Sequence, residues 1–210
     1  MTNDAEEGQM ADRLEVHQGP RRRGRPSNAS KEIAFEAART AYRSSQRLDM
    51  TAIAADLGVG RVTLHRWFGT REDLASEILY QEYSAAFDSA RRRAAGRGRD
   101  RIIDTLARLQ AAIAGDAALA ALLAEEPKVA LRILTSSGGG FQPRVVESIA
   151  QLIRDAERED GYRPPIDVDT LAYALVRVAE AFVYNDAVVG IKGELAELTS
   201  VQALLLDERT

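Results

Sequence analysis

The chain has 210 residues, of which 45% are hydrophobic and 29% are charged, as in an ordinary globular protein with one large core or two smaller ones. It contains no cysteine, which excludes disulfide bonds and thiolate metal sites. Because the sequence has neither an apolar leader nor a run of about 18 apolar residues, we expect a cytoplasmic protein without a membrane span.

The formal net charge of −4 argues by itself against a nucleic-acid partner, but the charges are unevenly distributed. Residues 1–20 carry one Arg against five acidic residues, whereas residues 21–75 carry eleven Lys and Arg against six acidic residues. Residues 76–210 are acidic again, with sixteen basic and twenty-one acidic residues. A basic module inside an acidic chain is typical of a protein that presents one end to phosphates.

The N-terminal segment divides into a leader and a basic arm. Residues 1–20 are polar, acidic and aperiodic, which predicts a disordered leader. Glycine and proline keep the basic run that follows from forming a helix. The arm either enters a DNA groove or is a solvated tail, and the helical pattern directly after it favours DNA. Its arginines are Arg21, Arg22, Arg23 and Arg25.

Apolar spacing and capping residues predict four helices in the next segment. They are a helix that begins at Lys31, two short helices over 50–57 and 61–68, and a fourth that continues to about residue 94. Ser30, Asp49 and Thr70 stand before three of these helices and can accept from the free amides of the first turn. The apolar face of the first helix is Ile33, Ala34, Ala37, Ala38, Ala41 and Tyr42.

The rest of the chain is also helical by pattern. We expect helices near 100–114, 117–125, 127–135, 143–160, 168–189 and 194–207, separated by glycine and proline. No segment shows sustained alternation of apolar and polar residues, so strands are not expected. The predicted fold class is therefore all-α.

Residues 49–68 have the pattern of a helix-turn-helix. Two short helices must cross closely, so small residues are needed at the crossing and a glycine in the turn. Ala54 and Ala55 provide the small residues, and Gly58 provides the turn. The expected inward set is Ile53, Leu57, Val59, Leu64 and Phe68, which leaves polar side chains around the outer face of the second helix.

The segment "LDMTAIAADLGVGRVTLHRWFGTREDL", together with the basic arm and the alanine-rich first helix, resembles the DNA-binding domain of TetR-family regulators. The resemblance implies that residues 21–75 bind operator DNA and that residues 76–210 form a helical domain for effector binding and dimerisation. The implied partners are double-stranded DNA, a small-molecule effector and a second copy of the chain, held through the C-terminal helices.

By this resemblance, Thr63 and His65 contact phosphates, while Arg61, Val62 and Arg66 face the bases. The arginines of the arm would enter the minor groove. The full set of candidate DNA-binding residues is Arg21, Arg22, Arg23, Arg25, Thr51, Gly60, Arg61, Val62, Thr63, His65, Arg66 and Arg71.

Several positions depart from the usual family motif, among them Ser44, which stands where a glycine is common after the first helix. Gly60 stands where a capping serine is common, so the free amides of the following helix are available to a phosphate. His65 replaces a tyrosine whose hydroxyl would reach phosphate, and a ring nitrogen of His65 could donate instead.

In the segment 168–189, polar and aromatic residues form a stripe beside an apolar face. Arg177 and Glu180 share one side of the helix and can pair. The stripe is either an exposed surface or the wall of an effector pocket. The candidate effector-binding residues are Arg132, Tyr173, Arg177, Glu180 and Tyr184.

Within the family, "RPPIDVDTLAYALVRVAEAFVYND" and "LRILTSSGGGFQPRVVESIAQLI" resemble regulators of quorum-signal degradation, which control enzymes that destroy acyl-homoserine lactones.

Two rival functions remain open at this point. One is an architectural or partner-binding helical protein without an effector. The other is a helical enzyme, but the two histidines, His17 and His65, form no cluster, and no phosphate loop or nucleophile motif is present. We therefore expect no enzyme activity, no metal site and no cofactor.

Two further features have a structural and a functional interpretation. Trp67 is either a core residue or a base-stacking residue, and we favour the core. The arginine-rich stretch 91–101 is either a second DNA surface or a helix end paired with acidic residues and helix carbonyls, and we favour the pairing.

Overall fold

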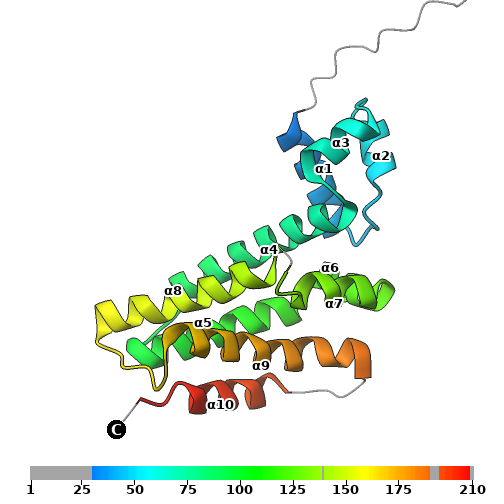
Figure 1. Cartoon of the computed structure of the whole chain (residues 1–210). Coiled ribbons are helices and arrows are strands. Elements are labelled where there is room, and N and C mark those ends of the chain that lie inside the picture. Colours follow the sequence, from blue (N-terminus) through cyan, green and yellow to red (C-terminus); the bar gives the residue numbers. More distant parts are fainter. Residues whose placement is uncertain (1–29, 139, 190–193, 209–210) are drawn as a thin grey trace, which may run out of the picture.

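The computed structural model describes residues 30–138, 140–189 and 194–208, and these residues form ten α-helices and no strand (Figure 1). This confirms the all-α prediction. The predicted leader and basic arm lie outside the described residues. The small N-terminal unit and the larger helical domain occupy opposite ends of the molecule (Figure 1).

The N-terminal unit consists of α1 (Lys31–Arg43), α2 (Met50–Asp56) and α3 (Arg61–Phe68). The long α4 (Arg71–Arg93) begins beside these three helices and continues into the helical domain (Figure 1). At 1.5 Å per residue, its 23 residues span about 34 Å. One continuous helix therefore connects the helix-turn-helix to the rest of the protein.

The three predicted N-caps are confirmed. Ser30 accepts a hydrogen bond from the amide of Ile33 at 3.3 Å, and Asp49 accepts one from the amide of Thr51 at 2.7 Å. Thr70 forms a complete capping box with Asp73 at the start of α4. These signals are local in sequence, which is why the helix starts could be predicted.

The helical domain continues with six further helices. They are α5 (Gly98–Ala114), α6 (Ala117–Glu125), α7 (Pro127–Thr135), α8 (Gln142–Asp160), α9 (Val168–Val189) and α10 (Leu195–Leu205). The start of α5 lies two residues before the predicted position. There the amide of Gly98 donates to the Asp160 carboxylate at 2.9 Å, a partner 62 residues away that no local pattern could indicate.

The core runs through both parts of the chain. In the helical domain, α5 contacts α4, α8 and α10, and its Ile102, Leu106 and Leu109 are buried. In the N-terminal unit the predicted apolar face of α1 is partly wrong. Ile33 is half-exposed, and Phe35 is buried in its place, because the Phe35 ring packs 6.2 Å from that of Phe68.

The arginine-rich stretch 91–101 pairs with acidic residues, which confirms the favoured interpretation. Arg91 pairs with Asp155, and Arg97 pairs with Asp160 at 3.0 Å. Arg99 likewise contacts Asp207 at 2.7 Å. These ion pairs attach the end of α4 and the start of α5 to α8 and the C-terminus, away from α3.

None of the described helices is by itself long and apolar enough to cross a bilayer. Helices α5 and α6 pass that test only as a pair, by length and composition, and they are bent by 60° at the break between them.

Candidate nucleic-acid interface and effector cavity

Helix α3 presents a polar outer face and is held in place by its inner face. The Leu64 side chain is fully buried, and Phe68 packs against the same core. On the opposite side Arg61, Val62 and Arg66 are exposed, with Val62 at 83% of its maximum. A helix with this division, carried on a helix-turn-helix, can enter the major groove with its outer face.

Gly58 makes the turn between α2 and α3 possible. Its φ is +64°, in the left-handed region that glycine adopts without strain. The amide of Gly58 donates to the carbonyl of Ala55 at 3.1 Å, and the amide of Val59 donates to that of Ala54 at 2.9 Å. This is the Schellman arrangement, which satisfies the last carbonyls of α2 and directs the chain into α3.

The amino end of α3 has no side-chain cap, as expected from Gly60. The amides of Thr63 and Leu64 donate to the Gly60 carbonyl at 2.8 and 3.2 Å. The amides of Arg61 and Val62 precede these two and point out of the first turn, where a phosphate could accept from them.

His65 differs from its expected role in one respect. Its Nδ1 lies 2.9 Å from the carbonyl oxygen of Gly69. A carbonyl only accepts, so Nδ1 carries the hydrogen, and Nε2 of the neutral ring has none to donate. His65 could therefore donate to a phosphate only in its doubly protonated form.

Trp67 is partly buried against the core and meets Phe68 edge to face, with ring centroids 6.3 Å apart. This confirms the prediction of a core residue. Thr51 is exposed at the first turn of α2, so its hydroxyl is accessible beside α3.

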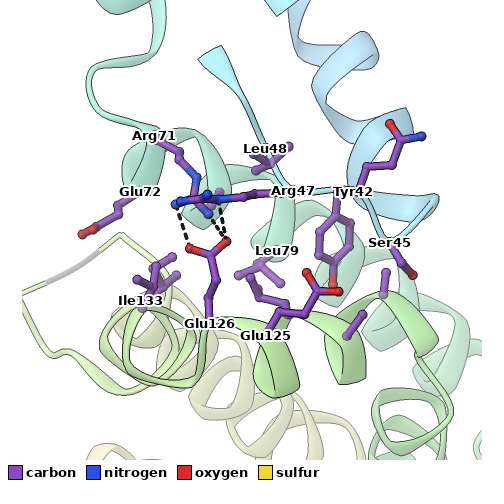
Figure 2. A pocket seen from close by; sticks show the side chains of 16 residues that line it. Tyr42, Ser45, Arg47, Leu48, Arg71, Glu72, Leu79, Glu125, Glu126 and Ile133 are labelled. Atoms are coloured by element: carbon purple, nitrogen blue, oxygen red, sulfur yellow. Dashed lines mark hydrogen bonds and ion pairs between the residues drawn. The ribbon is translucent and has the colours of Figure 1, made fainter. Parts of the chain in front are cut away.

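Arg71 points away from the outer face of α3 and toward the helical domain. Figure 2 shows its guanidinium on the carboxylate of Glu126, which lies between α6 and α7. The Arg71 Nη1 to Glu126 Oε2 distance is 2.9 Å, and Arg47, in the loop before α2, reaches Glu126 Oε1 at 3.5 Å. The hydrogen bonds from Arg71 lower the pKa of Glu126. One carboxylate thus holds both flanks of the helix-turn-helix.

The helical domain contains an amphipathic cavity of about 60 Å³, which we call the inner cavity. Its wall combines side chains of α4, α5, α8, α9 and α10, and most of that wall is apolar. The polar residues in the wall are Tyr83, Gln110, Glu180, Tyr184 and Gln202.

Glu180 is the acidic group of the inner cavity. Its side chain is only 11% exposed and pairs with Arg177 at 2.7 Å. Burial raises the pKa of Glu180, and the opposing effect of Arg177 is smaller. A carboxyl group with few water contacts favours a ligand that forms a hydrogen bond with it.

Two buried glutamines form the other polar group. Gln110 Nε2 donates to Gln202 Oε1 at 2.6 Å, and Gln202 Nε2 approaches the carbonyl of Leu175 at 3.4 Å. Gln110 Oε1 is buried and accepts no hydrogen bond. It is a second acceptor in the wall of the inner cavity.

The five candidate effector residues are only partly brought together: Arg177 pairs with Glu180, and its guanidinium lies 5.8 Å from the centre of the Tyr173 ring. Glu180 and Tyr184 line the inner cavity, whereas Tyr173 is half-exposed outside it. Arg177 contacts Glu180 and the carbonyl of Thr135, and Arg132 pairs with Glu72 beside the domain junction.

Gln110 and Gln202 were not among the residues predicted from the sequence. Gln110 directly follows Leu109 on the apolar side of the predicted helix 100–114. An amide side chain on the apolar side of a helix could have indicated a buried polar site, because a buried amide needs a hydrogen-bond partner.

Comparison with known proteins identifies the family. Residues 97–207, more than half of the chain, match the family model described as "Tetracyclin repressor-like, C-terminal domain". The chain belongs to the TetR family. TetR-family regulators bind DNA operators and dimerise, and this regulator has both the helix-turn-helix and the helical domain that these activities use.

Solved structures agree with this assignment. The transcriptional repressor QsdR of R. erythropolis, from the TetR family, is 26% identical and has a TM-score of 0.79, covering 86% of this chain and 96% of its own. The fatty acid degradation regulator FadR of Bacillus halodurans is 15% identical with a TM-score of 0.50, covering 84% and 93%, and shares the fold. No curated protein sequence matches this TetR-family regulator significantly.

Proposed function

We propose that this TetR-family regulator is a cytoplasmic repressor that binds its operator as a homodimer and releases it when a small molecule enters the inner cavity. The observation that carries the proposal is the contact of Glu126 with Arg47 and Arg71. It links the helical domain that contains the cavity to both flanks of the helix-turn-helix. QsdR, which is 26% identical, is described as a transcriptional repressor.

Operator binding would use the outer face of α3. The exposed side chains of Arg61, Val62 and Arg66 are those we assign to base edges. Thr63, Thr51 and the uncapped amides of the first turn of α3 are assigned to phosphates. The arginines of the arm would add minor-groove contacts. Arg71 would contact the DNA only if its ion pair with Glu126 were broken.

The homodimer would form through the C-terminal helices. Leu204 and Val201 of α10 and Tyr173 of α9 are exposed apolar or aromatic side chains, with Leu204 at 71%. A twofold interface over this surface would place two α3 helices to read half-sites about one helical turn apart, near 34 Å. The genes it controls would be those of quorum-signal degradation, by the resemblance of the C-terminal segments.

A combined binding experiment tests the proposal. Sedimentation at micromolar concentration should give a dimer, and gel shift should find a specific site in DNA adjacent to the gene. A metabolite extract of the host cell should then release the protein from that site. A monomer with or without operator, or sequence-independent binding that no extract changes, would contradict the proposal in favour of an architectural protein.

Glu126→Gln should weaken the coupling between the cavity and DNA. Glutamine keeps the size of the side chain but loses the charge that holds Arg47 and Arg71. Coupling between two sites is typically about 1–3 kcal/mol, and we expect the operator release caused by an active extract to fall by at least about half. Stability should change by no more than about 1 kcal/mol, because the ion pairs are partly exposed.

Glu125→Gln is the matched control, since Glu125 is adjacent and exposed. Equal release in both variants would show that the charge of Glu126 carries no coupling. The pKa of Glu126 is lowered in the folded protein. Its contribution is therefore present above the unfolded pKa of about 4.3 and is lost as the pH falls through the folded pKa. The comparison should accordingly be made near neutral pH.

A further inference from the structure

A second cavity lies beside the inner cavity and reaches the DNA-binding unit. It has a volume of about 50 Å³, and we call it the relay cavity. Four residues line both cavities and form a shared wall: Tyr83, Ile113, Phe141 and Tyr184. On its far side the relay cavity is lined by Tyr42 of α1. The two cavities are therefore neighbours across this shared wall, and the relay cavity is lined by a helix of the DNA-binding unit.

The dimensions of the two cavities restrict what can occupy them. One water-sized probe needs roughly 10–15 Å³ on this scale, so each cavity holds about four such volumes. Neither cavity alone accommodates a bulky or branched molecule. A molecule of ordinary metabolite size fits only if it is narrow and passes the shared wall, so that it occupies both cavities.

Each cavity contains a buried polar atom without a partner. Gln110, 2% exposed, lines the inner cavity and has an unpaired Oε1, and Tyr42, 5% exposed, lines the relay cavity and has an unpaired hydroxyl. Buried polar groups are almost always hydrogen-bonded, and an unmet one is unfavourable. These two atoms mark polar subsites in the two cavities, and the hydroxyl of Tyr83 in the shared wall between them is a third buried polar atom without a partner.

The groups around Tyr42 indicate the chemistry of the far end. The Asp116 carboxylate lines the relay cavity and accepts from the amides of Ala118 and Leu119 at 2.9 and 3.1 Å. Glu82 lines it too, and is bound to Arg39 at 2.6 Å. A hydroxyl on a ligand could accept from Tyr42 and donate to a carboxylate oxygen.

We propose that the effector is a narrow, unbranched molecule with a hydrogen-bonding group at each end, one held by Gln110 and Glu180 and the other by the hydroxyl of Tyr42. This inference rests on the proposed function. Because Tyr42 belongs to α1, the far end of the ligand touches the DNA-binding unit directly. Ligand length then determines whether that contact is made.

Calorimetry with two series of probes tests this site. The straight-chain α,ω-diols from butanediol to decanediol are compared with the primary alkanols of the same lengths. Short members of both series should bind alike, in the inner cavity alone. Once the chain is long enough to reach the relay cavity, each diol should bind about 3- to 10-fold more tightly than the alkanol of the same length, as expected for one added hydrogen bond.

Tyr42→Phe should abolish this diol preference and leave alkanol affinity unchanged. The melting temperature should stay the same or rise, because the variant removes a buried unpaired hydroxyl. Tyr80→Phe is the matched control, since Tyr80 also lies near the junction but lines neither cavity. A diol preference that survives Tyr42→Phe, or no diol binding at all, would overturn the proposal and leave the Tyr42 hydroxyl to an ordered water.

Ala86→Leu gives a second, independent test. Ala86 lines the relay cavity but not the inner cavity, so a larger side chain there should block long diols and spare short alkanols. Equal binding of long diols by this variant would also overturn the proposal.

Gel shift with the same diols separates the inference from the proposed function. Diols that bind with the expected length pattern but never release the operator would support the two-cavity site and contradict effector release. If a cell extract released the operator but diol binding showed no such length pattern, effector release would be supported and the two-cavity site contradicted.

Discussion

Leu64→Ala should lower the free energy of unfolding of the DNA-binding unit by about 2–5 kcal/mol. Leu64 is fully buried on the inner face of α3, so its truncation removes apolar contact and leaves a cavity. Trp67 is the only tryptophan of the chain and lies on the same helix. Its fluorescence during urea unfolding therefore reports this unit, and operator binding should fall as the unit loses stability.

Val62→Ala is the matched control for stability. Val62 lies two residues away on the same helix, but its side chain is 83% exposed. We expect its free energy of unfolding to stay within about 0.5 kcal/mol of wild type, while binding weakens at sites with a thymine under Val62. A large loss of stability in Val62→Ala, or none in Leu64→Ala, would mean that α3 turns a different face to the core.

Arg66→Ala should weaken specific operator binding by about 1–3 kcal/mol, roughly 5- to 150-fold. Arg66 is exposed on the outer face of α3, and a guanidinium that forms two hydrogen bonds to guanine is a strong source of specificity. The loss should be confined to one base position. Fluorescence anisotropy with operator variants substituted at single positions measures this.

Two controls separate base reading from general charge effects. Arg92→Ala removes the same charge from an exposed position near the other end of α4 and should change affinity little. Thr63→Ala should weaken binding to all operator variants alike, as loss of a phosphate contact does. If Arg92→Ala weakened binding as much as Arg66→Ala, the contribution of Arg66 would be general electrostatics.

The helix-turn-helix could be predicted from local sequence, because its signals act over a few residues. The caps at Ser30, Asp49 and Thr70 bind amides two or three positions away. The turn at Gly58 depends on the backbone freedom of one residue. Amphipathic spacing likewise predicted all ten helices of the described residues, since it reflects the burial of one face. The exposed face of α3 follows from the same periodicity.

Which polar side chains meet depends on how the helices pack. Arg71 was predicted to contact DNA because it is basic and directly follows the helix-turn-helix, yet its partner is Glu126, 55 residues away. Gln110 and Gln202 are 92 residues apart in the sequence but are joined by a hydrogen bond, and both line the inner cavity. Hydrogen bonds and ion pairs depend on distances of a few ångströms. Those distances are fixed by how whole helices pack, and no local pattern of residues records that packing.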